Sequence, residues 1–162
     1  MKKIDWENLS FGYQKTDYNV RCYYRDGKWG EIEVSSDENI NIHMAATCLH
    51  YGQEAFEGLK AYRCPDGKVR VFRPEENAAR LQRTCRGIVM AEPPTELFIE
   101  MVKKVVSLNE AYIPPYESGA TLYLRPLLIG TGAQVGVRPA EEYLFMIFVT
   151  PVGPYFKGGF ST

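Results

Sequence analysis

Two amphipathic helical segments, placed between groups of extended segments, constrain the fold of this chain most strongly. The first begins at residues 73–76, Arg-Pro-Glu-Glu. Proline fits the first turn of a helix, and the two carboxylates lie near the positive end of the helix dipole. Apolar residues then recur at helical spacing and predict a face toward the core. They are Ala78, Leu81, Cys85 and Ile88, and Gly87 is expected to mark the end of the helix.

A second helix is predicted after Pro93-Pro94, which separates the two segments. Thr95 is the expected N-cap, and Glu96 falls in the first turn. The apolar face of this helix consists of Phe98, Met101, Val102, Val105 and Leu108. A longer helix is excluded by Pro114-Pro115, because proline cannot continue a helix.

The segments before these helices carry turn signals between strand-like runs. Asp26-Gly27 separates residues 19–25 from residues 28–34, and Asp-Gly predicts a hairpin because both residues tolerate positive φ. Residues 65–67, Pro-Asp-Gly, separate a strand expected over 56–63 from one expected over 69–72. A short helix is expected through Met44-Ala45-Ala46.

Two further strands are predicted after the helices. Residues 121–125 form one of them, with Tyr123 and Arg125 on the same face because side chains alternate along a strand. Pro126 lacks a backbone donor, so this strand is expected to end there or to lie at a sheet edge. Residues 143–149 are almost continuously apolar, which predicts a strand covered on both faces.

The order of strands, two helices and strands predicts an α+β fold. We expect a mainly antiparallel, twisted sheet with two principal helices packed on one face. A chain of 162 residues is long enough for one substantial core, so one domain is expected.

Charge and cysteine content weigh against several classes of function. The formal net charge of −1 gives no electrostatic basis for binding nucleic acid or an anionic membrane. No apolar run is long enough to span a bilayer, and no secretion signal is read at the N-terminus. Cys22, Cys48, Cys64 and Cys85 form no CxxC pair and lie at no zinc-ligand spacing. We therefore expect buried, free thiols in a reducing compartment and no metal site.

Two arginine positions are candidates for binding an anion. Arg80, Arg83 and Arg86 share roughly one helical face, which is either a solvated basic face or, at one position, a bidentate grip on a group such as phosphate. Arg125 lies in an apolar strand, where a charge is costly unless it forms an ion pair or lines a cavity. Both alternatives stay open for Arg125.

The remaining patterns do not assemble into a catalytic set. Residues 50–63 place glycine beside aromatic and acidic residues, which fits either a tight turn into a buried strand or the wall of a pocket. The glycine-rich loop over 129–137 lacks the P-loop pattern, so a nucleotide site is rejected. Glu57 and the two histidines form no dyad, triad or metal set by spacing. From the residues alone, the chain is a globular domain with an aromatic, arginine-containing concavity.

A series of motifs carries a family resemblance through its order along the chain. The motifs are His50-Tyr51-Gly52, Phe56-Glu57-Gly58-Leu59-Lys60-Ala61-Tyr62, Phe72-Arg73-Pro74 with Asn77 to Leu81, Leu122-Tyr123-Leu124-Arg125-Pro126, Ile129-Gly130-Thr131, Gly136-Val137 and Pro151-Val152-Gly153-Pro154-Tyr155-Phe156. This series resembles the N-terminal half of the branched-chain amino acid aminotransferases, which are fold-type IV enzymes that use pyridoxal 5'-phosphate. The match covers most of the chain from Phe11 onward.

The resemblance implies roles for individual residues. Arg80 matches the arginine that holds the cofactor phosphate. Tyr51 and Phe56 match aromatic walls of the pocket for the substrate side chain. Tyr123 and Arg125 match a pair near the substrate carboxylate, and Tyr123 also lines the pocket.

Two further positions complete the site that the resemblance implies. Tyr155 matches another aromatic residue of the pocket. Val137 matches a loop residue that reaches the partner subunit's site, which implies a homodimer. The implied reaction is reversible amino transfer between leucine, isoleucine or valine and 2-oxoglutarate, and a cytoplasmic enzyme is expected.

The resemblance also implies a part that this sequence does not contain. The family's lysine, which forms the Schiff base, lies in the C-terminal half and would fall beyond Thr162. We therefore expect residues 1–162 to be the N-terminal, small domain of a two-domain aminotransferase, inactive when alone. The alternatives are a D-amino acid aminotransferase or an aminodeoxychorismate lyase of the same fold type, or a non-catalytic, stand-alone binding module.

Overall fold

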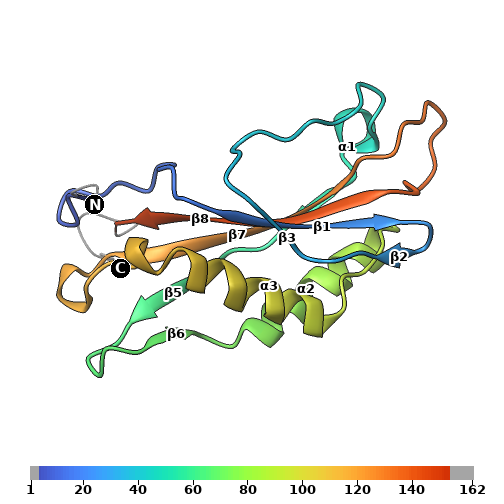
Figure 1. The fold of residues 1–162 in the computed structure, drawn as a ribbon. Helices are drawn as coiled ribbons and strands as arrows, with labels where there is room; N and C mark the ends of the chain where they lie inside the picture. Colours follow the sequence, from blue (N-terminus) through green and yellow to red (C-terminus); the bar gives the residue numbers. More distant parts are fainter. Residues whose placement is uncertain (1–3, 154–162) are drawn as a thin grey trace, which may run out of the picture.

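The computed structural model describes residues 4–153, which contain an antiparallel sheet of eight strands (Figure 1). Along the sheet the order is β2-β1-β8-β7-β5-β6, with β3 also paired to β1 and β4 also paired to β7. The strands are β1 (Asn19–Arg25), β2 (Lys28–Trp29), β3 (Glu33–Ser35), β4 (Glu54–Phe56), β5 (Leu59–Arg63), β6 (Val69–Val71), β7 (Thr121–Gly130) and β8 (Tyr143–Val152).

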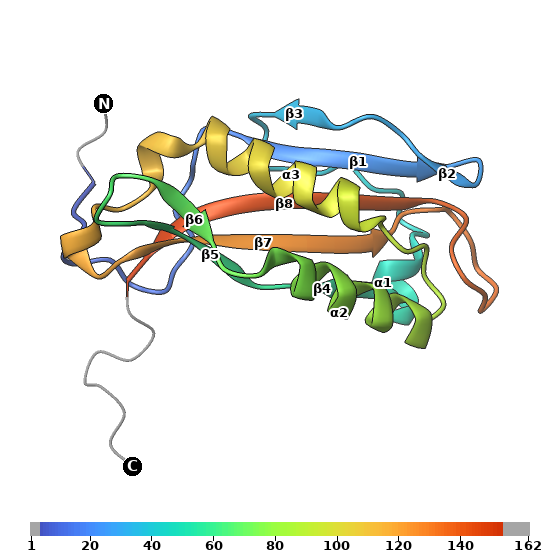
Figure 2. The same cartoon turned by 90° about the horizontal axis from the view of Figure 1, so that it is seen from below.

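Two long helices, α2 (Pro74–Gly87) and α3 (Thr95–Leu108), lie together on one face of the sheet, as Figures 1 and 2 show. The short helix α1 (Thr47–Tyr51) lies on the opposite side. Two 3-10 turns, η1 (Glu110–Tyr112) and η2 (Tyr116–Ser118), follow α3. No helix within residues 4–153 is long and apolar enough to cross a membrane. The predicted α+β architecture, with both principal helices on one face, is confirmed.

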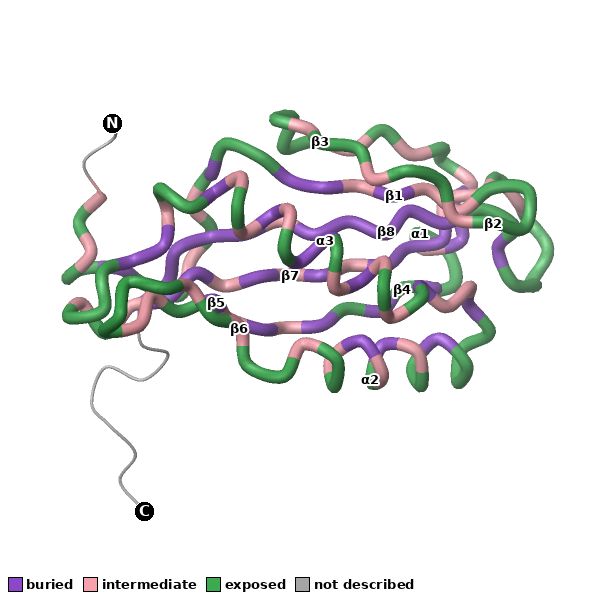
Figure 3. Tube along the Cα trace, turned by 60° about the horizontal axis from the view of Figure 1, so that its bottom comes forward, coloured by how far each residue is buried: buried purple, intermediate pink, exposed green. Residues whose placement is uncertain are grey.

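The centre of the sheet is the pairing of β7 with β8, which continues over ten residues of each strand. β8 is buried along nearly its whole length (Figure 3). On one side it packs against α3, and on the other Leu144 and Met146 contact Ile40 and Ile42 of the segment that follows β3. The prediction that residues 143–149 form a strand covered on both faces is therefore confirmed.

The main core lies between the sheet and the two long helices. Its large side chains that are almost fully buried are Val20, Leu81, Phe98, Met101, Val105, Leu122, Leu124, Leu128, Phe145, Ile147 and Val149. The rings of Phe98 on α3 and Phe145 on β8 stack with their centroids 5.9 Å apart. The apolar stripes of both helices thus pack on the sheet, as their spacing predicts.

One of the four residues predicted to lie on the buried face of α2 is not buried. Ala78, Leu81 and Cys85 are buried, but Ile88 is 41% exposed. The helix ends at Gly87, so Ile88 lies past its last helical residue, and Val89 follows with a φ of 55°. Helical spacing therefore no longer determines the direction of the Ile88 side chain.

The predicted start of α3 is also wrong by one residue. Thr95 is the first residue of the helix, Pro94 occupies the cap position, and no side chain caps the helix. The hydroxyl of Thr95 instead accepts a hydrogen bond from Gln82 Nε2 at 3.3 Å. This bond links α3 to α2 in place of the expected cap.

Two of the predicted local elements before the helices need correction. Asp26 and Gly27 have φ values of 51° and 75°, which confirms the turn, but the returning arm is divided into β2 and β3, with residues 30–32 between them. Residues 44–46 do not form a helix, and α1 begins at Thr47. Ala46 is extended because it forms a bridge with Ala133 of the loop between β7 and β8.

Pro126 neither ends β7 nor lies at a sheet edge. It lies within β7, in register with Ile147 of β8. The strand on the other side of β7 is interrupted here, because β4 ends at Phe56 and β5 begins at Leu59. The Pro126 carbonyl accepts a hydrogen bond from the Glu57 amide at 2.9 Å. In an antiparallel strand the amide and the carbonyl of one residue point to the same side. The nitrogen of Pro126 therefore points toward the interruption, where no ladder hydrogen bond requires an N–H donor.

The four cysteines divide into two pairs by burial. Cys22 and Cys85 are fully buried, and burial raises the pKa of the Cys85 thiol to about 11. Cys48 and Cys64 are only half-buried. The expectation that all four thiols are buried is therefore confirmed for Cys22 and Cys85 and wrong for Cys48 and Cys64. All four are free thiols in the structure.

Replacing Phe98 by alanine should lower the free energy of unfolding by about 3–5 kcal/mol, because it removes a buried ring and leaves a cavity. Phe72→Ala is the matched control, because the same ring is 78% exposed at that position. The control should change the free energy of unfolding by less than about 0.5 kcal/mol. Urea unfolding measures both, and equal losses would contradict the position of the core.

Candidate functional site

The candidate site is organised by the interruption between β4 and β5, at Phe56-Glu57-Gly58. Phe56 pairs with Leu127 of β7 and projects from the face opposite the long helices. Glu57 projects the other way, toward α2. Gly58 carries no side chain, and a Cβ there would lie 2.5 Å from Tyr123 Oη. The predicted single strand over residues 56–63 is wrong, because β4 ends at Phe56 and β5 begins only at Leu59. Phe56 and Glu57 face opposite sides of the sheet, as adjacent residues of an extended segment do.

On the helix side, Glu57 holds Arg80 by two parallel hydrogen bonds. Arg80 Nε donates to Glu57 Oε1 at 2.8 Å, and Arg80 Nη2 donates to Glu57 Oε2 at 2.7 Å. Asn77, one turn earlier on α2, donates from Nδ2 to Glu57 Oε2 at 2.8 Å. The hydrogen bonds from Arg80 to Glu57 raise the pKa of Arg80 above its ordinary value.

The two partners of this pair differ strongly in exposure. The side chain of Glu57 is 3% exposed, whereas that of Arg80 is 61% exposed. Arg80 thus reaches from a buried carboxylate to the surface, with its remaining N–H groups directed away from Glu57. Arg83 is exposed, and Arg86 pairs with Glu92, so the three arginines do not form one uniform solvated face.

On the open face of the sheet, Arg125 is held by aromatic rings. Its guanidinium carbon lies 4.5 Å from the ring centroid of Phe56 and 5.3 Å from that of Tyr123. Arg125 Nε donates a hydrogen bond to Tyr123 Oη at 3.2 Å. Within residues 4–153, no carboxylate lies within ion-pair distance of Arg125. The strand-edge ion pair is therefore wrong, and the alternative of a cavity-lining arginine fits the structure.

A small hollow lies beside these residues, under the segment that precedes β1. Its volume is about 190 Å³, and it is lined by Phe11, Gly12, Tyr13, Tyr123, Arg125, Phe148, Thr150 and Val152. The rings of Phe11 and Tyr123 meet edge to face with centroids 5.3 Å apart. The Thr150 hydroxyl accepts a hydrogen bond from the Gln14 amide at 2.8 Å and donates one to the Gln14 carbonyl at 3.1 Å. These bonds fix the N-terminal segment over the open face.

Tyr13 closes the same hollow from a fixed position. Its ring packs against Phe148, and its hydroxyl donates to Glu38 Oε1 at 2.6 Å. Burial, together with this hydrogen bond, raises the pKa of Tyr13 to about 12. Phe11 and Tyr13 were not predicted as site residues, because the N-terminal segment is aromatic but has no period that indicates a face. Phe148 was predicted only as part of the buried strand over residues 143–149.

Tyr51 and Val137 form a second group, at the loop between β7 and β8. Tyr51 Oη donates to the carbonyl of Val135, and the Gln134 amide donates to the Ala45 carbonyl at 3.0 Å. Val135 and Val137 are each 85% exposed. The structure therefore brings together Phe56, Tyr123 and Arg125, but it places Tyr51 beside the loop of Val137. Tyr155, the last residue that the resemblance implied, lies outside the described residues.

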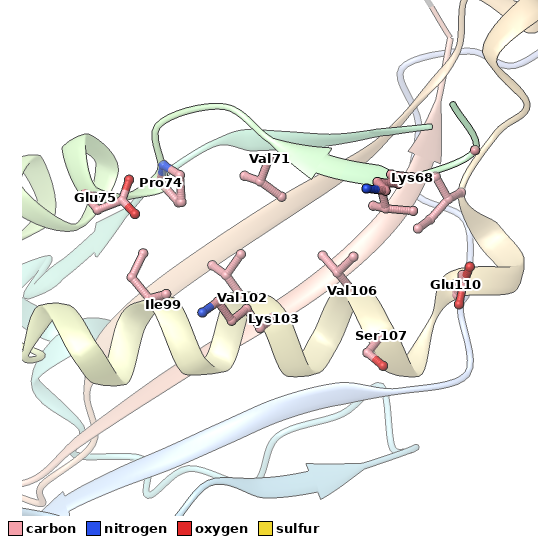
Figure 4. A pocket seen from close by; sticks show the side chains of 13 residues that line it. Lys68, Val71, Pro74, Glu75, Ile99, Val102, Lys103, Val106, Ser107 and Glu110 are labelled. Atoms are coloured by element: carbon pink, nitrogen blue, oxygen red, sulfur yellow. The ribbon is translucent and has the colours of Figure 1, made fainter. Parts of the chain in front are cut away.

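An apolar groove of about 670 Å³ lies away from all of these residues, between the β5–β6 hairpin and α3 (Figure 4). Val71 and Pro74 face Ile99, Val102 and Val106 across it. The charged side chains at its rim, Lys68, Glu75, Lys103 and Glu110, come from exposed positions and have both signs. No buried polar group of the described residues converges on the groove, so it lacks the features of a specific ligand site.

Comparison with known proteins finds similar sequences that share one enzyme name. The chain is 53% identical over 161 residues to the branched-chain-amino-acid aminotransferase of Haemophilus influenzae, and 47% identical over 159 residues to that of Helicobacter pylori. These matches cover 99% and 98% of this chain. Over nearly its whole length the chain is homologous to branched-chain-amino-acid aminotransferases. It spans about half the length of these relatives, 47% in each case. No protein-family model matches the chain.

Solved structures show the same fold. A crystal structure of the Escherichia coli branched-chain amino acid aminotransferase matches 89% of this chain with a TM-score of 0.68 at 23% identity. The match covers 42% of that enzyme. The holo form of the Thermobaculum terrenum enzyme matches 91% of this chain with a TM-score of 0.64 at 19% identity. The sheet with two helices on one face is thus a fold found within branched-chain aminotransferases.

Gly58→Ala should lower the free energy of unfolding by about 1–3 kcal/mol, because the new methyl group forces the Tyr123 hydroxyl away from a packed position. The matched control is Gly87→Ala at the end of α2, where no atom lies within 4 Å of the new Cβ. That change should leave stability unaltered or raise it by about 0.4–1 kcal/mol. Urea unfolding compares the two variants, and a Gly58→Ala protein as stable as the control would contradict the contact with Tyr123.

Proposed function

We propose that residues 1–162 form the N-terminal domain of an aminotransferase that exchanges the amino group between leucine, isoleucine or valine and 2-oxoglutarate. The observation that carries this proposal is the position of Arg125, a cation that lies between Phe56 and Tyr123 and has no carboxylate partner among residues 4–153. A cation beside apolar rings suits a ligand that combines a carboxylate with an aliphatic side chain. The names of the relatives support branched-chain amino acids as the amino donors.

Tyr123 can act together with Arg125 on a carboxylate. Its hydroxyl oxygen accepts the hydrogen bond from Arg125 Nε, so its own proton is available to donate. A carboxylate placed between them would accept hydrogen bonds from both a hydroxyl and a guanidinium. The hollow formed with Phe11 and Phe148 then offers apolar surface beside that point.

The cofactor of the proposed reaction is pyridoxal 5'-phosphate. Two structurally similar enzymes were solved with this cofactor or with pyridoxamine 5'-phosphate. The residues of this chain fit the phosphate group, because Arg80 presents exposed N–H groups while its other edge is fixed on Glu57. When bound, the cofactor supplies the electron sink for amino transfer. Arg80 would hold its phosphate, and the lysine of the reaction would come from a second domain.

The group at Tyr51 supports a homodimer. Met44, Leu49, Val135 and Val137 are exposed apolar residues of α1, the turn before it and the loop that contacts it. Exposed apolar clusters of this kind mark interaction surfaces. We infer that Val137 and Tyr51 reach the partner subunit's site, that Tyr155 adds an aromatic wall, and that the enzyme is cytoplasmic.

Amino transfer by the natural product that contains this sequence tests the proposal. That protein should transfer the amino group of leucine, isoleucine and valine to 2-oxoglutarate, whereas residues 1–162 alone, with added pyridoxal 5'-phosphate, should not. Glutamate formation in a substrate panel measures both. A preference for D-alanine would support a D-amino acid aminotransferase instead, and activity of residues 1–162 alone would contradict the proposed second domain.

Arg125→Leu should lower kcat/KM for 2-oxoglutarate in that natural product by about 10- to 100-fold, because a hydrogen bond to a charged group contributes about 1.5–3 kcal/mol. The matched control is Arg25→Leu, since the Arg25 guanidinium also lies over a tyrosine ring, 4.6 Å from the centroid of Tyr23. Initial rates at several 2-oxoglutarate concentrations measure the effect. An equal loss in both variants would point to stability rather than substrate binding.

A further inference from the structure

The hydrogen bonds between Arg80 and Glu57 use only one edge of the guanidinium. Nε and Nη2 both donate to the carboxylate. Nη1 has no hydrogen-bond partner among residues 4–153, and Nη2 retains a second hydrogen. The edge formed by Nη1 and Nη2 can therefore donate two parallel hydrogen bonds, the geometry that matches two oxygens of one phosphate.

Glu57 is itself fixed by the sheet and by α2. Its amide donates to the Pro126 carbonyl at 2.9 Å, so its backbone is tied to the central strand. Its carboxylate accepts a hydrogen bond from Asn77 in addition to those from Arg80. Asn77 Nδ2 also approaches the Gly58 carbonyl at 3.4 Å, which spans the interruption between β4 and β5. The carboxylate is thus a rigid reference point, whereas an exposed arginine without such a partner samples many rotamers.

We propose that Glu57 is a positioning residue that presets the Nη1–Nη2 edge of Arg80 for the cofactor phosphate. This proposal rests on the proposed function, because the anion is the phosphate of pyridoxal 5'-phosphate. Glu57 acts through Arg80 and touches no reacting atom. The contrasting explanation is purely structural, namely that the pair only stabilises the fold at the interruption between β4 and β5.

The experiment compares the natural protein with its Glu57→Gln variant in binding pyridoxal 5'-phosphate and pyridoxal, which lacks the phosphate. Glutamine keeps the shape of the side chain but cannot accept both Arg80 bonds. We expect Kd for pyridoxal 5'-phosphate to rise about 10-fold, because a charge-assisted pair is lost, and Kd for pyridoxal to stay within about 2-fold. Absorbance titration measures both constants, and a thermal melt records stability separately.

Matched variants separate positioning from charge and from stability. Glu54→Gln on β4 and Arg83→Gln on α2 remove the same groups at exposed positions and should leave both constants unchanged. Arg80→Gln should weaken pyridoxal 5'-phosphate binding, and the double variant with Glu57→Gln should be no weaker than Arg80→Gln alone, because both act through one contact. Asn77→Ala removes one hydrogen bond to Glu57 and keeps the ion pair. It should weaken the binding of pyridoxal 5'-phosphate by a smaller factor and leave the binding of pyridoxal unchanged. This variant provides the test if Glu57→Gln does not fold.

A readout without ligand completes the test. In the ligand-free protein, the Arg80 Nε proton should exchange with water more slowly than that of Arg83 by NMR, and Glu57→Gln should remove this protection. Equal weakening of pyridoxal and pyridoxal 5'-phosphate in Glu57→Gln, or a loss of stability with both constants unchanged, would overturn the inference. Failure of the proposed function would look different: the unaltered protein would bind neither compound, and the inference would be overturned with it.

Discussion

The continuous pairing of β7 with β8 is the constraint on which the rest of the structure depends. It places the side chains of β7 alternately on two faces over ten residues. Leu122 and Leu124 enter the core under the helices, whereas Tyr123 and Arg125 lie on the open face. A shift of one residue in this register would exchange the two sets and expose the leucines. The packing of the core therefore also fixes the residues that we assign to the substrate.

The interruption between β4 and β5 lies at the centre of the proposed site. Pro126 allows the interruption, because its carbonyl satisfies the Glu57 amide and it has no amide that needs a partner there. Phe56 and Glu57 then face opposite sides of the sheet, one toward Arg125 and the other toward Arg80. A single peptide thus connects the proposed substrate side and the proposed phosphate side, so their relative position is set by the backbone rather than by flexible side chains.

Sequence patterns predicted the elements whose signals are local, and they failed where a distant partner decided the outcome. The helices α2 and α3, the turn at Asp26-Gly27 and the buried strand β8 follow from spacing, turn chemistry and apolar runs. The rule for proline in strands was wrong for Pro126, because it ignores an interruption in a neighbouring strand. Glu57 was missed since its partner Arg80 is 23 residues away on a helix, and no spacing rule relates the two. The family resemblance identified Arg80, but only the structure shows what holds it.

The two arginines differ in how their charge is balanced, and this difference has consequences for the proposed site. Among residues 4–153, the Arg125 guanidinium contacts two aromatic rings and the Tyr123 hydroxyl but forms no ion pair, so its charge remains available to attract a carboxylate. Arg80 is neutralised by the buried Glu57 carboxylate, so the pair as a whole offers no net charge to a phosphate dianion. Arg80 can therefore contribute orientation and two hydrogen bonds, while the charge of the phosphate needs further donors. Under the proposed function, we therefore expect the proposed second domain to supply those donors as well as the lysine of the reaction.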